Sequence, residues 1–480
     1  MYKSFLIIGG FLCSTANSTR LSDGCLGRSW RSYKVSLEQA RSSLLRLDYL
    51  DSLSQLSGIL MNLLLDPHKA FECATAVASG CHLAAQVAST LGRPVMAVRL
   101  AQATSIFLAF DFQTRGQLWI DQSEWGIRWE DSISNVLTTM SAYQLLLDPY
   151  ESPKSSMPTP TSTKMSLAVV SVCDYNNTIT PLALLSKINK ETYANRWDYD
   201  LYMYPESPRF QDVFTHLARI PDDRPPAWSK IDAVLNAMAL GVYDWVMWMD
   251  CDSFFIDQSL SIERIITYEH QKKGLAVESA FSTADQQTAV QQMAVWRPTD
   301  TVAGFDDLRR QFDEYLDSFV PVTSEDIYFI ASEDGLMLNT GVFLVKSHPA
   351  AFRTLQKVRG YTFNGNPMTY HTWWEQAAFV HLLSLPKIFS ALSNSSTLSA
   401  SGYEDGIVIV PQREINGYPP VVSQMLKTHA TFQTDDYIVS FSGCRVYSSQ
   451  PMCNMLFLSN FCSIEDLCSK LDWSRFIGYF

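Results

Sequence analysis

The chain has 480 residues, 47% of them hydrophobic and 18% charged, which is the composition of a folded globular protein and excludes a disordered one. Its formal net charge of −12 comes without a basic cluster, which argues against nucleic-acid binding. The length allows roughly two to three domains. The negative charge fits a protein that binds anionic substrates through a metal ion.

The N-terminus has the pattern of a secretory signal peptide. Lys3 precedes an apolar run, Phe5–Cys13, and the small residues Ser14 and Ala16 precede a cleavage point after Ala16. About nine apolar residues are too few to span a bilayer. We therefore predict that residues 1–16 are a signal peptide; the alternative is an apolar N-terminus of a cytosolic protein.

Residues 17–150 are mostly helix-like and carry no recognisable chemistry, so we interpret them as a helical stem or accessory region. Cys73 and Cys81 lie eight residues apart in this region, about 12 Å along a helix axis, which is too far for a disulfide. Residues 151–165 are rich in Pro, Ser and Thr and read as a linker.

Beyond the linker, strand-like and helix-like segments alternate, and the initial βαβαβ order predicts a right-handed parallel sheet of an α/β fold. No glycine-rich loop follows Cys173, which argues against a dinucleotide-binding dehydrogenase or a P-loop NTPase. The expected strands are Leu167–Cys173, Tyr199–Tyr204, Trp245–Met249, Ile327–Ala331, Gly341–Val345, Ile407–Val410 and Tyr437–Phe441. The expected helices are Pro181–Asn195, Pro226–Gly241, Ser259–Glu269, Pro349–Val358 and Trp373–Leu383, with a polar insertion at 270–324.

Trp245–Met249 is a short apolar run that ends abruptly in Asp250-Cys251-Asp252. A run of this kind fits a strand covered on both faces, and ligands bind at the carboxyl ends of such strands in open α/β sheets. In an extended segment, Asp250 and Asp252 would face one cation together, with Cys251 turned aside. Carboxylate oxygens suit Mn²⁺ or Mg²⁺. A second Asp-x-Asp, Asp198 and Asp200, precedes a strand and is interpreted as a solvated turn.

Ten cysteines are compatible with disulfides in a secreted chain. Four of them crowd the C-terminal end and could staple it: Cys444, Cys453, Cys462 and Cys468.

Several motifs follow one another between Leu167 and Phe457. They are WSK from Trp228, YDWVMWMDCDSFF from Tyr243, NTGVFLVKS from Asn339, WWEQAAF from Trp373, VPQREINGYP from Val410 and SFSGCR from Ser440. In this order and spacing they resemble family 34 glycosyltransferases, which include fungal α-galactosyl- and mannosyltransferases and plant xyloglucan xylosyltransferases.

The resemblance implies a GT-A type nucleotide-diphospho-sugar transferase domain over residues 166–480. It also implies a nucleotide-diphosphate sugar donor, a glycan acceptor and a divalent metal, typically Mn²⁺. By matching motif positions it assigns metal binding to Asp250 and Asp252, donor binding to Lys230, Asn339, Asn416, Gly417 and Arg445, and the reacting centre to Glu375 and Gln376.

These assignments agree with the chemistry of glycosyl transfer. A diphosphate leaving group gains negative charge as the glycosidic bond breaks, and a cation with nearby Lys or Arg stabilises that charge. Family members retain anomeric configuration, so the acceptor is expected to attack from the leaving-group face and to give its proton to the leaving phosphate. Gln376 would orient the donor or acceptor.

Several of the motif residues also have a plainer interpretation. Lys230 fits a solvated lysine on an amphipathic helix, Glu375 a surface acid, and Asn339 a partner for buried backbone. Trp373 and Trp374 are interpreted as core packing rather than as a platform for a sugar.

One position departs from the family pattern. Ser440 stands where the family carries a metal-ligating histidine, and a hydroxyl is a weaker ligand than an imidazole; His429 could compensate only if its loop folds back.

From the motifs together, the chain is expected to be a retaining, metal-assisted glycosyltransferase of the secretory pathway, with the Golgi as the expected compartment. The alternative is a non-catalytic sugar-nucleotide or glycan-binding subunit of a transferase complex.

Overall fold

The computed structural model describes residues 73–115 except 92, 164–297 except 176–179, 212–219, 222 and 274–283, and 327–388 except 336, 385 and 386. It describes residues 35–60 and 307–318 in part, and 403–471 except 404, 421, 424–430, 434–435, 445–448 and 465–466. The predicted signal peptide and most of the predicted linker lie outside these residues. In the described part of the chain, no helix is both long and apolar enough to cross a bilayer.

The chain divides into two compact units. Unit 1 comprises residues 1–147, 335–338 and 366–404, and unit 2 comprises residues 148–334, 339–365 and 405–480. Unit 1 therefore groups the N-terminal helical region with residues 366–404, which come after Lys346 and before Ile407 in the chain.

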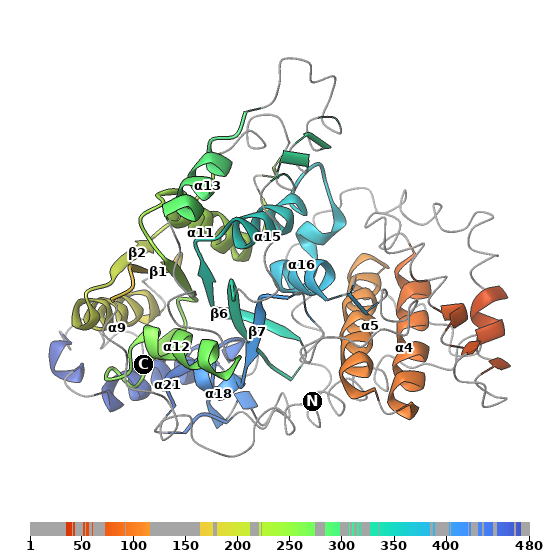
Figure 1. Cartoon of the computed structure of the whole chain (residues 1–480). Helices are drawn as coiled ribbons and strands as arrows, with labels where there is room; N and C mark the ends of the chain where they lie inside the picture. Colours follow the sequence, from red (N-terminus) through yellow and green to blue (C-terminus); the bar gives the residue numbers. More distant parts are fainter. Residues whose placement is uncertain are drawn as a thin grey trace. The chain divides into compact units, whose positions relative to one another are not determined.

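Unit 1 is built on two helices, α4 (Ala74–Thr90) and α5 (Pro94–Arg115), which lie side by side (Figure 1). Pro94 opens α5, where its missing N–H costs nothing. The helix α16 (Trp374–Leu383) also packs on α5, and the neutral ring of His371 bonds the carbonyl oxygen of Ile106 at 2.8 Å. Cys81 is a free buried thiol and Cys73 is disulfide-bonded elsewhere, so these two do not bridge, as predicted.

Unit 2 carries a six-stranded sheet in the order β2-β1-β3-β6-β5-β7. β1 pairs in parallel with both β2 and β3, which confirms the predicted parallel βαβαβ start, whereas β6 runs antiparallel to β3. The α/β class with an N-terminal helical region is confirmed and is consistent with a GT-A fold. The strands are β1 (Leu167–Val172), β2 (Asp200–Tyr204), β3 (Trp245–Met249), β5 (Phe329–Glu333), β6 (Leu338–Lys346) and β7 (Ile407–Val410).

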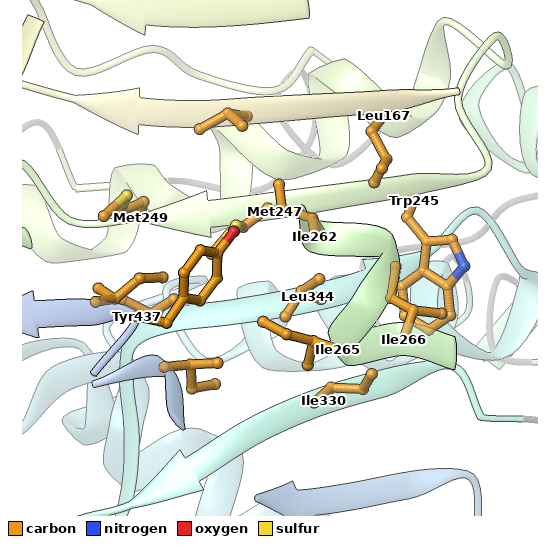
Figure 2. Packing of buried hydrophobic residues seen from close by; sticks show 14 of the residues in the cluster. Leu167, Trp245, Met247, Met249, Ile262, Ile265, Ile266, Ile330, Leu344 and Tyr437 are labelled. Atoms are coloured by element: carbon orange, nitrogen blue, oxygen red, sulfur yellow. The ribbon is translucent and has the colours of Figure 1, made fainter. Parts of the chain in front are cut away.

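The apolar run of β3 is buried along its whole length because helices cover both faces of the sheet. α11 (Ser229–Ala239) packs on β1 and β3. On the opposite side, three isoleucines of α12 (Ile262–Lys272) join Trp245, Met247 and Leu344 in one cluster (Figure 2). Burial of such side chains stabilises the sheet by roughly 2 kcal/mol each, which is why this strand was readable from sequence.

Two expectations for the sheet change in detail. Asn339 and Thr340 were placed just before a strand at Gly341, but both lie inside β6 because their backbones continue the ladder with β3. The helix expected at Pro226–Gly241 is a 3₁₀ turn, η2 (Pro226–Trp228), followed by α11. Gly241 has φ of 65°, a conformation that suits glycine after a helix end.

Helices α9 (Leu182–Trp197) and α15 (Pro349–Gly360) follow the predicted segments at 181–195 and 349–358. A separate two-stranded sheet is formed by β4 (Ser253–Phe255) and β8 (Ile438–Ser440). In the chain, β4 follows β3 and β8 follows β7. At the C-terminal end, disulfides Cys444–Cys453 and Cys462–Cys468 tie α21 (Gln450–Ser463), which confirms that this cysteine-rich segment is stapled.

Candidate functional site

The acidic pair sits in a tight turn directly after β3. The Ser253 amide donates to the Asp250 carbonyl oxygen at 3.1 Å, so the segment is a turn and not the extended strand assumed from sequence. The turn is held to its neighbours: Asp250 N donates to Gly341 O at 2.7 Å, and Phe441 N donates to Asp252 O at 3.0 Å. Backbone contacts from β6 and from the end of β8 therefore place both carboxylates at this edge.

Asp198 and Asp200, the second acidic pair, are exposed at the start of β2, as predicted. Asp198 has φ of 58° and forms an ion pair with Lys164 at the surface. The two Asp-x-Asp sequences thus differ in location, and only Asp250 and Asp252 lie at the carboxyl end of a buried strand.

Asp250 is bound by two side chains through the same oxygen. Lys230 Nζ lies 3.1 Å from Asp250 Oδ1, and Trp248 Nε1 donates to that oxygen at 2.7 Å. Lys230 also donates to the carbonyl oxygen of Thr340 at 3.0 Å and lies over the Trp248 ring, 5.6 Å from its centroid. Lys230 is buried, so the interpretation as a solvated lysine is wrong.

Oxygen atoms gather around Gly341, which faces Asp250 from β6. A Cβ atom on Gly341 would lie 2.9 Å from Asn339 Oδ1, 3.4 Å from Asp250 Oδ2 and 3.5 Å from Ser442 Oγ. The missing side chain thus leaves room between a carboxylate, an amide and a hydroxyl oxygen. These are the hard ligands that Mn²⁺ and Mg²⁺ prefer, so the residues present fit such an ion.

No group of three or more His, Cys, Asp or Glu side chains that could hold a metal occurs among the described residues. Ser440, which replaces the family histidine, is buried on β8 opposite Ser253. Its hydroxyl contacts the Ser253 hydroxyl at 3.2 Å and the Ser442 hydroxyl at 2.9 Å. Linked serine hydroxyls therefore occupy the place where the family carries an imidazole. His429 lies outside the described residues.

Lys190 on α9 belongs to this site and was missed from sequence. Its buried ammonium donates to the carbonyl oxygens of Asp250 at 3.0 Å and Ser253 at 3.1 Å, and to the Ser186 hydroxyl. Burial lowers the pKa of Lys190 to about 7, against the opposing effect of Asp252 and Asp250. The signal was present, because Lys190 stands one turn from the buried residues Ser186 and Tyr193 on the inner face of α9.

Asp252 is electrostatically linked to the same groups. Burial, followed by the neighbouring charge of Asp250, raises the pKa of Asp252 to about 7, while Lys190 and Lys230 act in the opposite direction. Two neighbouring carboxylates, with two lysines beside them, form a compact charge cluster of the kind found at functional sites.

Cys251, between the two aspartates, forms a disulfide with Cys173 just beyond β1. The Cα atoms of the pair are 5.1 Å apart, and the residues are 78 positions apart in the sequence. Cys251 is therefore turned away from the carboxylates, as predicted, and it ties their turn to the neighbouring strand.

Asn339 and Asn416 lie in unit 2 together with the acidic pair. Asn339 Oδ1 accepts the Gly341 amide at 2.7 Å, and its Nδ2 donates to Asp334 at 3.0 Å and to the Tyr418 hydroxyl. Asn339 thus pairs with a buried backbone amide, as in the plainer interpretation, and also links the side chains of Asp334 and Tyr418.

Asn416 is fully buried, and neither polar atom of its side chain has a hydrogen-bond partner among the described residues. Such an orphaned amide is costly without a ligand or a water.

Gly417 follows Asn416 and is tightly packed. Its amide donates to Ile438 O at 3.1 Å, and an added Cβ would lie 3.4 Å from both Ile438 O and Asp436 Oδ2. The turn that carries Asn416 is thereby held against β8.

Glu375 and Gln376 lie in unit 1 on the first turn of α16. Gln376 Nε2 donates to the carbonyl oxygen of Leu338, the residue before Asn339, at 3.1 Å. Glu375 is buried, so the surface-acid interpretation is wrong. Trp374 is 39% exposed with φ of 39°, so core packing is also wrong for this residue. Arg445 lies outside the described residues.

The chain was compared with known structures, curated proteins and family models. Among solved structures, the chain is similar to a glycosyltransferase described as "involved in the glycosylation of the major capsid of PBCV-1", with 12% identity and a TM-score of 0.33 over 61% of this chain and 98% of that one. No curated protein matches the sequence. The family model of the galactosyl transferase GMA12/MNN10 family matches residues 167–451, more than half of the chain, and the protein therefore belongs to this glycosyltransferase family.

Proposed function

We propose that the protein is a retaining glycosyltransferase that moves a hexosyl or pentosyl unit from a nucleotide-diphosphate sugar to a glycan acceptor. The observation that carries the proposal is the charge cluster at the end of β3, in which Asp250 and Asp252 meet the buried ammonium groups of Lys230 and Lys190. Family membership supports glycosyl transfer, and the cluster supports a diphosphate donor.

A divalent cation, Mn²⁺ or Mg²⁺, is part of the proposal. Asp250 and Asp252 would hold it, with the oxygens of Ser442 and Asn339 close to Asp250 Oδ2 through the space above Gly341. When bound, the ion supplies positive charge to a leaving diphosphate.

Side chains of the protein would supply further positive charge and hydrogen-bonding groups for the donor. Lys230 is placed to donate hydrogen bonds to phosphate oxygens, since its ammonium already lies at the carboxylate. Asn416 offers an amide with unused donor and acceptor atoms, which suits the hydroxyl groups of a sugar or ribose. The anomeric configuration of the sugar is retained if the acceptor hydroxyl attacks from the leaving-group side and its proton passes to the departing phosphate oxygen.

The roles proposed for Gln376 and Glu375 rest on their motif. Gln376 would orient the donor or the acceptor and stabilise positive charge on the sugar, and no strong side-chain base is needed. Gln376→Ala is expected to lower transfer by at least tenfold while donor binding persists, because orientation affects the reacting state more than the bound state.

The experiment that tests the function is a donor screen. Purified protein with Mn²⁺ is incubated with a panel of nucleotide sugars, and donor hydrolysis and transfer are measured. At least one donor should be consumed, and Asp250→Asn should abolish turnover. Unchanged turnover in Asp250→Asn would contradict the role of the acidic pair, and absence of turnover with all donors despite intact donor binding would contradict the enzymatic role.

Ser440 favours one second candidate, a non-catalytic sugar-nucleotide or glycan-binding subunit of a transferase complex. The buried serine hydroxyls offer no imidazole to a cation. Calorimetry of Mn²⁺ together with a nucleoside diphosphate separates the two cases, since tight binding accompanied by turnover leaves no role for the second candidate.

We also propose that the protein works in the lumen of the secretory pathway, at the Golgi. The disulfides of unit 2 support this, because such bonds persist in oxidising compartments. Fractionation of cells that express the chain should place it with Golgi markers, and recovery in the cytosolic fraction would contradict the proposal.

A further inference from the structure

The ion pair between Lys230 and Asp250 uses the same carboxylate that the proposed cation needs. Lys230 Nζ lies 3.1 Å from Asp250 Oδ1 and is fixed by Thr340 O at 3.0 Å. The Lys230 side chain is 5% exposed and the Asp250 side chain 29%, so the ammonium is largely shielded from water while the carboxylate is within reach of a dissolved ion. A divalent ion at Asp250 would therefore meet an ammonium group at close range.

Asp250 does not depend on Lys230 for its orientation. Trp248 Nε1 donates to Asp250 Oδ1 at 2.7 Å, and Asp250 N is fixed to Gly341 O. The carboxylate can keep its place while the ammonium leaves. Lysine has a flexible four-carbon stem and three N–H donors, so a small rotation can carry its charge to another anion.

Resting on the proposed function, we propose that Lys230 is an exchangeable counter-cation. In the free protein it neutralises Asp250 and weakens binding of a divalent ion alone. When a nucleoside diphosphate arrives with the ion, the ammonium moves from the carboxylate to the phosphate oxygens. The exchange couples the two ligands and disfavours a loaded cation without donor.

Loss of the Lys230 charge should have opposite effects on the two ligands. Removing the positive charge from the site should weaken binding of the diphosphate, and the same change should strengthen binding of the divalent ion. Couplings between two ligands typically change the affinity of each by roughly 5- to 150-fold. Lys230→Met, which keeps the length and removes the charge, is therefore expected to bind Mn²⁺ alone at least tenfold more tightly than the wild type.

The experiment measures Mn²⁺ binding by electron paramagnetic resonance, with and without uridine or guanosine diphosphate. Lys230→Met should gain affinity for Mn²⁺ alone and lose affinity for the diphosphate, and Lys230→Arg should resemble the wild type in the first measurement. Lys187→Met is the matched control: Lys187 is 57% exposed on α9 and ion-paired with Glu191, so its loss should change neither affinity.

Equal Mn²⁺ affinity of the wild type and Lys230→Met overturns the inference, and so does the absence of Mn²⁺ binding in every variant. Donor hydrolysis is measured separately, with and without Mn²⁺, so a failure of the exchange is distinguishable from a failure of the transferase function.

A measurement on the unaltered protein guards against a variant that does not fold. Reductive methylation followed by mass spectrometry reports how accessible the Lys230 ammonium is. Mn²⁺ alone at saturating concentration should increase labelling of Lys230, and addition of the diphosphate should suppress it again, while labelling of Lys187 stays constant. Labelling of Lys230 that is unaffected by Mn²⁺ overturns the inference.

Discussion

The ammonium of Lys190, buried on α9, donates to the backbone carbonyl oxygen of Asp250 at 3.0 Å. It also donates to the Ser253 carbonyl oxygen at 3.1 Å, so one ammonium holds both ends of the acidic turn. The helix thus fixes the backbone that carries both carboxylates, without using their side-chain oxygens.

Lys190→Met is expected to lower the free energy of unfolding by about 2–3 kcal/mol, because buried carbonyl groups lose a charged donor. Donor hydrolysis should fall as well, since the turn loses its support. Chemical denaturation and hydrolysis rates check both effects. Lys187→Met on the exposed face of the same helix should stay within about 0.5 kcal/mol of the wild type; an equal loss in both variants would contradict the supporting role.

Gly341→Ala should disable the site. The new methyl group would lie 2.9 Å from Asn339 Oδ1 and 3.4 Å from Asp250 Oδ2, where it fills the space between the oxygens. Binding of Mn²⁺ with a nucleoside diphosphate, measured by calorimetry, should weaken at least tenfold.

Gly360→Ala is the control for that change. Gly360 ends α15, and an added Cβ meets nothing within 4 Å. This variant should bind normally and unfold at the same or a slightly higher temperature, because alanine is the better helix former by about 1 kcal/mol. Normal binding in Gly341→Ala would exclude the role given to this space.

The Cys173–Cys251 disulfide should matter more than Cys462–Cys468. Its bond closes a segment of 78 residues, against 6 for the other, and it ends inside the acidic turn. Replacing Cys173 and Cys251 by serine should cost about 2–5 kcal/mol of stability and reduce donor hydrolysis. Replacing Cys462 and Cys468 should cost less and leave hydrolysis intact; the reverse ranking would contradict this expectation. Denaturation under non-reducing conditions measures the difference.

Unit 1 should lose stability in mild acid. Burial lowers the pKa of His371 to about 4, and burial with the neighbouring His371 lowers the pKa of His381 to about 4, from an ordinary value of 6.5. His371 uses both ring nitrogens: one faces Ile106 O at 2.8 Å, and the other accepts the Trp373 amide at 3.0 Å.

Because the unfolded chain binds these protons first, the stability is fully present above pH 6.5 and is lost as the pH falls toward 4. The loss is on the order of a few kcal/mol for the pair. Denaturation at several pH values measures it. His371→Gln should be less stable at pH 7 but show a shallower slope, and an unchanged slope would contradict the assignment.

Much of the fold could be predicted because its signals are local. The apolar run Trp245–Met249 is a strand wherever both of its faces are covered, and the break at Asp250 marks its end. Asn339 and Thr340 were misplaced because polar residues seldom continue a buried strand. Here they do so because Asn339 bonds Asp334 and the Gly341 amide, and Thr340 accepts from Lys230.

The missing parts of the site depend on distant pairings. Lys190 was passed over because a lysine on the buried face of a helix is costly unless acceptors wait there, and those acceptors are carbonyl groups 60 and 63 residues away. The partner of Cys251 could not be read from spacing, since cysteine connectivity follows the fold and not the sequence.

The bond between Cys173 and Cys251 also has a consequence for biosynthesis. Its two thiols meet only after β3 has docked beside β1, with the whole of α9, β2 and α11 in between. Oxidation of this pair therefore marks the moment when the first half of the sheet is assembled. Until this bond forms, the turn of Asp250 and Asp252 lacks its covalent tie to the end of β1.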